Sequence, residues 1–253
     1  MEKKLLVLFK EEVFLPLLNT SLEIAKKLSL EIVIYCIDCE EEEVLKLYGI
    51  YKKNSSQPKV DITDSDPEEI IEKERPHLIL LPKLELNPIA HAFKTPWSEK
   101  LALELKDYNL LLLKVDNPYL KKALLYVDRD NCSENYIRNA YKFLTSLGID
   151  FKFSTIFDEQ YFEFLLKKEH PEIEAKEILG RMFEDYIAAV REKIKKALNL
   201  EQVEILPLKG EERKSLPYFA KLHNYDLLVI SQAIQDRDEV IQNSETSLAI
   251  FEN

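Results

Sequence analysis

Short apolar runs alternate with longer amphipathic segments along the chain. Continuous apolar runs of this kind are typical of parallel strands that are buried on both faces. Helix-start signals lie between several of the runs, and in Asp66-Pro67 the aspartate can cap a helix whose first turn holds the proline. The alternation therefore predicts an α/β fold. In the first half of the chain the predicted strands are 5–9, 32–37, 59–63, 78–81 and 110–115.

The same order of segments begins again at mid-chain. The run Lys3–Phe9 has a near copy in Lys121–Val127, and His77–Leu81 has one in Asp226–Ile230. A repeat of about half the chain length indicates a duplicated domain. In the second half the predicted strands are 124–127, 151–157, 203–206, 227–230 and 248–251.

Each half therefore predicts a doubly wound, five-stranded parallel sheet of Rossmann-like type, with right-handed crossovers through helices. The turn sequence Asp116-Asn117-Pro118 marks the boundary, which gives domains 1–117 and 118–253. The second half carries an extra segment around 158–200, which predicts a helical insertion with a break at His170-Pro171 and a long helix over 177–198.

The insertion begins with an aromatic and aliphatic cluster, Tyr161-Phe162-Glu163-Phe164-Leu165-Leu166, which a minimal domain of this kind does not need. One interpretation is that the cluster covers a sheet edge or the core. The other is that it forms an apolar surface for a protein partner or a small ligand.

Composition and charge narrow the functional classes. Hydrophobic residues make up 46% of the 253 residues and charged residues 32%, a Glu- and Lys-rich balance typical of thermophile proteins. The net charge of −11 argues against binding to nucleic acid or to an anionic membrane, because both need basic surfaces. No segment resembles a signal peptide or a membrane span, so we expect a cytoplasmic location.

Candidate chemistry is sparse. Cys36 and Cys39 form a lone C-x-x-C that acidic residues follow, which disfavours a thiolate and predicts inert thiols, with a redox or disulfide role as the alternative. The four histidines have no metal-ligand spacing, and no nucleophile or phosphate-loop motif occurs. We expect no catalytic residues and no metal site.

The segment Trp97-Ser98-Glu99-Lys100-Leu101, followed by Asn109–Leu113, resembles the V-S-E-K-V helix and last strand of universal stress proteins. The resemblance covers nearly the whole chain outside the insertion. It implies a tandem, non-catalytic stress-response protein with the adenine nucleotide α-hydrolase-like fold. In that family domains pair through their last strands, which implies pairing here through Leu110, Leu111, Leu112, Leu113, Leu248 and Ile250.

Members of that family that bind ATP carry the pattern G-x2-G-x9-G-[ST] after the fourth strand, where glycines let backbone N–H groups close on phosphates. The four glycines of this chain, Gly49, Gly148, Gly180 and Gly210, all lie elsewhere. The first corresponding loop contains prolines, which lack N–H donors, and the second, 231–246, carries acidic residues. We therefore expect that neither half binds ATP or AMP and that the chain has no cofactor.

ATP-binding members also have an aspartate at the end of the first strand. Lys10 stands there in the first half, whereas Asp128 stands there in the second. Asp128 is open to two interpretations: a turn or capping residue, or a residual cofactor-binding residue that contacts a ribose or base.

The sequence thus favours a regulatory protein that acts through contacts with an unknown protein partner, with a homodimer left open. The first alternative is a nucleotide or small-ligand sensor that binds through the second domain near Asp128. A hydrolase or ligase of the wider adenine-nucleotide superfamily is a further alternative, which rests on fold analogy alone.

Overall fold

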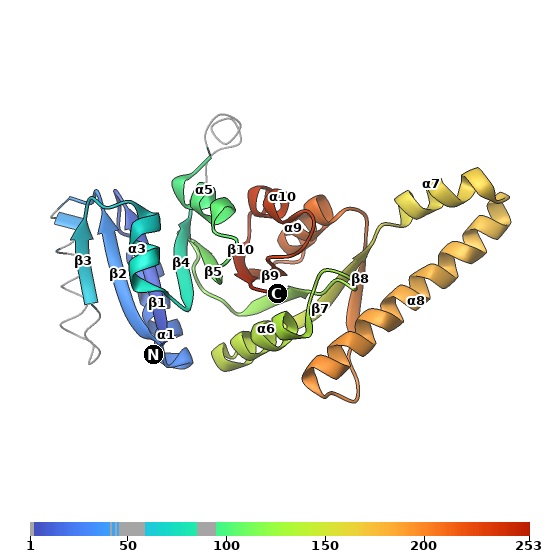
Figure 1. Cartoon of the computed structure of the whole chain (residues 1–253), viewed down its shortest axis with the longest axis horizontal. Coiled ribbons are helices and arrows are strands. Elements are labelled where there is room, and N and C mark those ends of the chain that lie inside the picture. Colours follow the sequence, from blue (N-terminus) through green and yellow to red (C-terminus); the bar gives the residue numbers. More distant parts are fainter. Residues whose placement is uncertain (1–2, 41, 44, 46–58, 85–94) are drawn as a thin grey trace. The chain divides into compact units, whose positions relative to one another are not determined.

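The computed structural model describes residues 3–40, 42–43, 45, 59–84 and 95–253 (Figure 1). Most of the charged segment 40–53, for which the sequence indicates a short helix, lies outside these ranges, as do the loop 54–58 and most of the first proline-containing loop. The chain divides into two compact units. The first unit comprises residues 1–120 together with 247–250, and the second comprises 121–246 together with 251–253.

The first unit contains a parallel sheet in the doubly wound order, with strand β3 at the edge. Its strands, in sheet order, are β3 (Lys59–Thr63), β2 (Glu31–Ile37), β1 (Lys4–Lys10), β4 (Leu78–Lys83) and β5 (Leu110–Lys114). The C-terminal strand β10 (Ser247–Phe251) then pairs antiparallel with β5. Leu248 lies opposite Leu112 and Ile250 opposite Leu110.

Three helices of the first unit are α1 (Leu15–Leu28), α3 (Pro67–Glu74) and α5 (Trp97–Glu104). Their starts follow local sequence rules. Pro16 lies in the first turn of α1, and the Asp66 side chain caps α3 by accepting a 3.1 Å hydrogen bond from the Glu68 N–H. Strands β1, β2, β4 and β5 are almost wholly buried, as the apolar runs predicted, whereas strand β3 is partly exposed.

The second unit repeats the plan with four parallel strands, so the predicted α/β fold with mostly parallel strands is confirmed. In sheet order its strands are β8 (Ile205–Lys209), β7 (Asp150–Phe157), β6 (Lys122–Tyr126) and β9 (Leu227–Ser231). Its shorter helices are α6 (Glu134–Leu147), α9 (Glu212–Leu222) and α10 (Arg237–Asn243). The fifth strand expected in this half is β10, most of which belongs to the first unit.

Strand β8 differs from its prediction. The expected range was 203–206, whereas the strand covers Ile205–Lys209 and contains Pro207. Because β8 pairs only with β7 and ends the sheet, the missing N–H of Pro207 breaks no ladder hydrogen bond on a second side. A proline that signals the end of an inner strand is therefore compatible with an edge strand.

The insertion consists of helices α7 (Glu159–Glu169) and α8 (Glu172–Leu198), which pack against each other as a hairpin with the predicted break at His170-Pro171 (Figure 1). Helix α8 begins earlier than the expected residue 177. Its first turn lacks a continuous apolar stripe, but Glu172 and Glu174 there complement the helix dipole. Among the described residues, no helix combines the length and apolar character needed to cross a bilayer.

Candidate ligand site in the second unit

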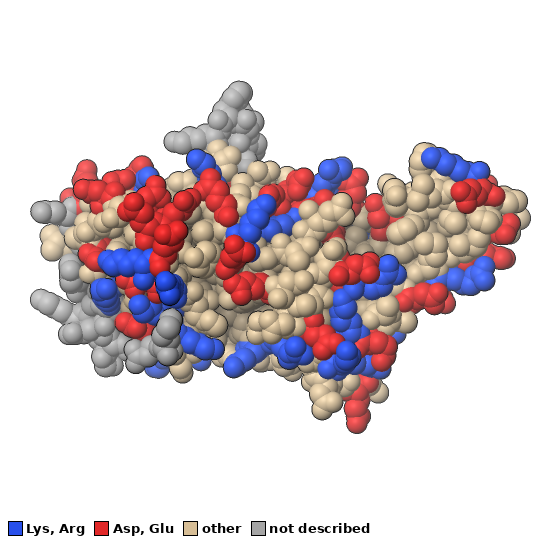
Figure 2. Space-filling view, in the orientation of Figure 1, with Lys and Arg blue, Asp and Glu red and all other residues tan. Residues whose placement is uncertain are grey.

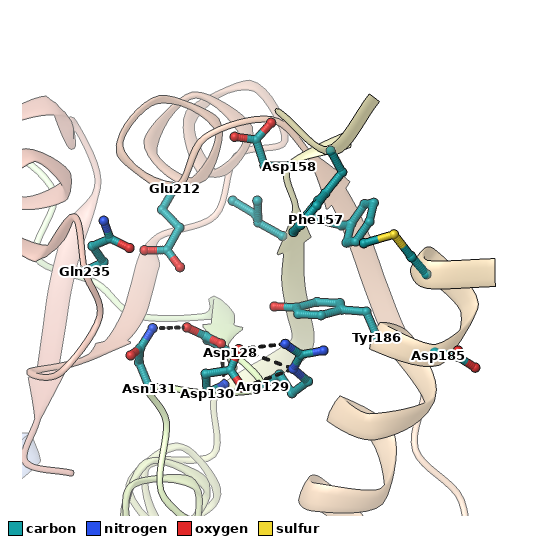
Figure 3. A pocket seen from close by; sticks show the side chains of 13 residues that line it. Asp128, Arg129, Asp130, Asn131, Phe157, Asp158, Asp185, Tyr186, Glu212 and Gln235 are labelled. Atoms are coloured by element: carbon teal, nitrogen blue, oxygen red, sulfur yellow. Dashed lines mark hydrogen bonds and ion pairs between the residues drawn. The ribbon is translucent and has the colours of Figure 1, made fainter. Parts of the chain in front are cut away.

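A cavity of about 460 Å³ lies at the carboxyl ends of β6 and β7 (Figure 3). In a parallel α/β sheet this is the edge at which ligands usually bind. Four groups of residues line it: the loop after β6, the end of β7, the start of α9 with the loop after β9, and the insertion. They are Asp128, Arg129, Asp130, Asn131, Ile156, Phe157, Asp158, Glu212, Gln235, Phe162, Met182, Asp185 and Tyr186.

Asp128 follows β6 and is only 6% exposed. Its Oδ1 accepts a 2.6 Å hydrogen bond from the Asp130 N–H, and its Oδ2 accepts a 2.5 Å bond from Asn131 Nδ2 (Figure 3). Both carboxylate oxygens therefore stabilise their own loop, which is the geometry of the turn interpretation. A ligand at Asp128 would have to share these oxygens.

Helix α8 of the insertion holds the same loop in place. Lys193 Nζ donates to the backbone carbonyl oxygens of Asp128 at 3.5 Å and Cys132 at 2.7 Å, and also to that of Arg129. An ammonium group has three N–H donors, so one side chain can satisfy three carbonyls. The insertion thus has a structural role at the site, which the sequence did not predict.

Aromatic side chains form the wall between β7 and the insertion. The Phe157 ring stacks on Phe162 with centroids 5.0 Å apart and lies 5.6 Å from both Phe183 and Tyr186. The Arg129 guanidinium lies 5.3 Å from the centre of the Tyr186 ring, a cation–π contact. Phe162 therefore covers the end of β7, as one interpretation of the aromatic cluster expected.

The rest of that cluster behaves differently. Tyr161, Phe164 and Leu165 are exposed, which is the surface expected under the other interpretation. The two interpretations thus apply to different members of one cluster, on two sides of helix α7.

Glu212 at the start of α9 is the cavity residue that sequence reasoning missed. The Tyr126 hydroxyl donates a hydrogen bond to its Oε1, whereas its buried Oε2 accepts none that meets ordinary distance and angle limits. Burial raises the pKa of Glu212, the Asp128 charge adds to the rise, and the Tyr126 hydroxyl and the Asp236 N–H oppose it. Burial also raises the pKa of Tyr126 well above its ordinary value. Tyr126 itself was a signal, since a buried tyrosine needs a partner for its hydroxyl.

The cavity carries an excess of acidic groups. Its lining includes the carboxylates of Asp128, Asp130, Asp158, Asp185 and Glu212, against one guanidinium, Arg129. Arg129 is already paired with Asp130 at 3.0 Å, and that partner raises its pKa. Such a lining repels phosphate groups and suits neutral or cationic ligands.

The loop after β9, where a phosphate-binding loop would lie, uses its own backbone donors. The Gln232 N–H donates to the Phe251 carbonyl at 2.8 Å. The next two N–H groups donate to Ser231: the Ala233 N–H to its Oγ at 3.1 Å and the Ile234 N–H to its carbonyl oxygen at 3.4 Å. These N–H groups are therefore turned into the protein rather than toward a bound anion.

In the first unit the corresponding strand ends carry cations. Lys10 Nζ at the end of β1 lies 3.7 Å from an Asp38 carboxylate oxygen, and Lys83 Nζ at the end of β4 lies 3.5 Å from Glu99 Oε1. Both Lys83 and Glu99 are buried. The loop that follows Lys83 lies largely outside the described residues.

The cysteines of the C-x-x-C pair are free thiols. Burial raises the pKa of Cys36 to about 12, and burial together with Glu43 and Asp38 raises that of Cys39. Within the described ranges, no group of three or more His, Cys, Asp or Glu side chains gathers as metal ligands would.

No protein-family model matches the sequence, and no curated protein matches it. The structure, however, is similar to solved structures over 99% of the chain. One is described as a candidate universal stress protein from Pseudomonas aeruginosa UCBPP-PA14, with a TM-score of 0.71, 15% identity and 93% of that chain covered.

Two further structures extend the comparison. A universal stress protein from Archaeoglobus fulgidus DSM 4304 has a TM-score of 0.58 and 15% identity, covering 98% of this chain and 96% of the other. The cytoplasmic domain of a prokaryotic cation chloride cotransporter has a TM-score of 0.56 and 12% identity, covering 99% and 95%. At these identities the likeness concerns the fold, and the chain has the fold of the universal stress proteins.

Proposed function

We propose that this chain is a regulatory protein of the universal stress protein type that does not bind ATP and acts, without catalysis, through contacts with other protein molecules. The observation that carries the proposal is the loop after β9. Its N–H groups at Gln232, Ala233 and Ile234 donate to acceptors within the protein, so they do not form a phosphate cradle.

Charge supports the same conclusion. The cavity beside this loop is lined by five carboxylates and by a single arginine that is already paired. In the first unit, Lys10 replaces the aspartate that ATP-binding members carry after the first strand. The proposal includes a cytoplasmic location and the use of the last strands, β5 and β10, in pairing.

Isothermal titration of the full chain with ATP and with AMP, in magnesium-containing buffer, tests the proposal. The expected result is no heat above dilution up to millimolar ligand. Micromolar binding of either nucleotide would overturn it. The variant Arg129→Gln is the matched control for weak residual binding. If the wild type does give binding heat with a nucleotide, removal of the arginine that lines the cavity should abolish that heat.

The cavity itself favours a second candidate function, a small-ligand sensor in the second unit. Its walls combine stacked aromatic rings with acidic groups, and Glu212 Oε2 is buried beside it without a hydrogen bond of ordinary distance and angle. Such a site suits a neutral or cationic molecule with a flat ring and hydrogen-bond donors. Neutral adenosine fits this description better than its phosphates.

A thermal-shift series of adenosine, AMP and ATP distinguishes the candidates. A sensor of this kind should be stabilised by adenosine and progressively less by AMP and ATP, because each phosphate adds repulsion. A second series uses the variant Glu212→Gln. Asp128 is not substituted, because its carboxylate also stabilises its own loop. Equal, negligible shifts for all three compounds count against an adenosine sensor.

A further inference from the structure

The cavity of the second unit contains more negative charge than its own lining balances. Four of its five carboxylates are either bonded within the protein or exposed to water: Asp128, Asp130, Asp158 and Asp185. The Asp158 side chain accepts a 3.0 Å hydrogen bond from the Tyr161 N–H at the start of α7. Asp185 is exposed, so solvent screens its charge. The carboxylate that remains is that of Glu212.

Glu212 has no free cation beside it among the described residues that line the cavity, since Arg129 is already paired with Asp130. Its Oε1 accepts the hydrogen bond from Tyr126, and its buried Oε2 accepts none of ordinary distance and angle. Figure 3 shows this carboxylate pointing from α9 towards the loop that holds Asp128. A buried acceptor without a donor costs free energy. A ligand that supplies both N–H donors and positive charge would recover this free energy.

Asp128 can share such a ligand without releasing its own loop. A carboxylate offers about four lone-pair positions, and the bonds from the Asp130 N–H and from Asn131 use two of them. An ammonium group has three N–H donors, which can reach oxygens of both Asp128 and Glu212. The nearby ammonium group of Lys193 does not serve here, because it donates to backbone carbonyls of the same loop.

The size and the aromatic wall of the cavity indicate the rest of the ligand. A volume of about 460 Å³ is typical of small-molecule sites and exceeds what a single water or metal ion fills. The apolar part of the lining includes Phe157 and Phe162, whose stacked rings favour a flat apolar body. Figure 2 shows acidic and basic side chains interspersed along the α7–α8 hairpin. The preference for a cation therefore arises from the cavity lining, not from a hairpin surface of one sign.

We propose that this cavity binds an organic cation, a primary amine on an aromatic body. Its ammonium group lies between Glu212 and Asp128, and its ring packs against Phe157 and Phe162. The inference rests on the second candidate function, the small-ligand sensor, and names the chemical class of its ligand. A neutral ligand of the same shape leaves the charge of Glu212 uncompensated, and an anionic one is repelled by it.

Three probes of nearly equal size and shape test the charge preference: phenethylamine, 2-phenylethanol and phenylacetate. They are cationic, neutral and anionic in that order, and ligand-observed NMR titration of the full chain measures the dissociation constant of each. Phenethylamine should bind at least about tenfold more tightly than 2-phenylethanol, and phenylacetate should not bind. An amine that does not bind, or that binds no more tightly than the alcohol or the acid, would overturn the proposal.

Two variants separate the contribution of charge from that of packing. Glu212→Gln should weaken phenethylamine binding about tenfold, to the level of 2-phenylethanol, and the alcohol then reports whether the cavity is still formed. Phe162→Leu should weaken both probes by a similar factor. The matched control is Glu211→Gln, because Glu211 pairs with Arg213 and Lys214 and does not line the cavity. The control should keep the preference for the amine, whereas a preference that survives Glu212→Gln would contradict the assigned cation partner.

The probe series and the adenosine series have separate outcomes. Adenosine binding without a preference for amine over alcohol would support the sensor and refute the organic cation. A clear preference for the amine, with no thermal shift from adenosine, would support the organic cation and exclude adenosine as the ligand. Micromolar ATP binding would overturn the first proposed function whichever probe binds.

Discussion

Each unit hydrogen-bonds a glutamate to a strand tyrosine, but the surroundings of the two pairs are opposite. In the first unit, Glu74 accepts a 2.9 Å hydrogen bond from the Tyr35 hydroxyl. Lys4 Nζ lies 2.7 Å from its Oε2, and Lys59 Nζ lies 3.6 Å from its Oε1. In the second unit, Glu212 accepts a hydrogen bond from Tyr126, and its other oxygen accepts none of ordinary distance and angle.

The pKa shifts follow these surroundings. The hydrogen bond from Lys4 is the largest cause that lowers the pKa of Glu74, and Tyr35 and Lys59 lower it further. Burial raises the pKa of Glu212, and the nearby Asp128 charge raises it further. A Glu–Tyr pair is thus a stable ion cluster where lysines surround it, and an uncompensated acid where they do not.

The two glutamates also lie at different ends of the parallel strands of their units, and this position bears on the role of each carboxylate. Glu74 ends helix α3 and contacts Lys4 at the start of β1, the amino end of the parallel strands, where ligands of α/β sheets do not usually bind. Glu212 begins α9 and lines the cavity at the carboxyl ends of the strands, where ligands of α/β sheets bind. Uncompensated charge therefore occurs where it can act on a ligand.

The largest expected effect comes from breaking the compensated cluster. Glu74→Gln removes the acceptor of a charged hydrogen bond and leaves Lys4 and Lys59 without their anion, which should cost about 2 kcal/mol of unfolding free energy at pH 7. Because the pKa of Glu74 is lowered on folding, its contribution is present above the ordinary glutamate pKa and is lost as pH falls. Urea denaturation at several pH values measures both effects.

Glu72→Gln is the matched control for that variant, since Glu72 is an exposed glutamate on the same helix. Its effect should stay within about 0.5 kcal/mol. Equal costs for the two variants would mean that the Glu74 cluster does not stabilise the first unit.

A smaller effect should follow from releasing the loop after β6. Lys193→Met keeps the aliphatic stem but removes the hydrogen bonds to three backbone carbonyls, and it should cost about 1.5 kcal/mol. Hydrogen exchange at residues 128–132 should accelerate in the same variant. The matched control, Lys195→Met, removes only a 3.0 Å ion pair with Glu192 and should cost less than about 0.5 kcal/mol. Unchanged exchange would show that Lys193 does not hold the loop.

Most of the fold could be predicted from the sequence because buried parallel strands carry a strong local signal. The runs at Leu5–Phe9 and Leu227–Ile230 are apolar throughout and became inner strands. Edge strand β8 was misplaced because Pro207 is a local breaker whose effect depends on which neighbours the strand has. Nor does periodicity reveal that β10 pairs antiparallel with β5, because that choice depends on tertiary contacts.

The candidate site could be predicted from the sequence only in part. Asp128 was singled out because the resemblance implies an aspartate at the end of the first strand of each half, and its turn geometry fits one of its two interpretations. Glu212, Tyr186 and Lys193 are distant from it in sequence and meet it only through the insertion and α9. A tyrosine in a buried strand, such as Tyr126, signals that its hydroxyl needs a partner, but a single sequence does not identify which distant residue supplies it.

The smallest effect, and the sharpest test of the comparison, concerns Glu212→Gln. Because folding raises the pKa of Glu212, its contribution to stability is fully present below the ordinary glutamate pKa and is lost as pH rises through the folded-state pKa. Glutamine is neutral at every pH, so the variant does not suffer this loss of stability as pH rises. The variant should therefore gain stability relative to the wild type as pH rises, by up to about 1 kcal/mol.

The neighbouring residue provides a control of opposite sign. Glu211 is paired with Arg213 at 2.7 Å and Lys214 at 3.2 Å, and these partners lower its pKa. The stability difference between Glu211→Gln and the wild type should therefore run the other way with pH. Parallel profiles for the two variants would contradict an uncompensated Glu212. Opposite slopes at adjacent positions would show that burial without a cation, and not the helix start that both residues share, sets the charge state of the cavity.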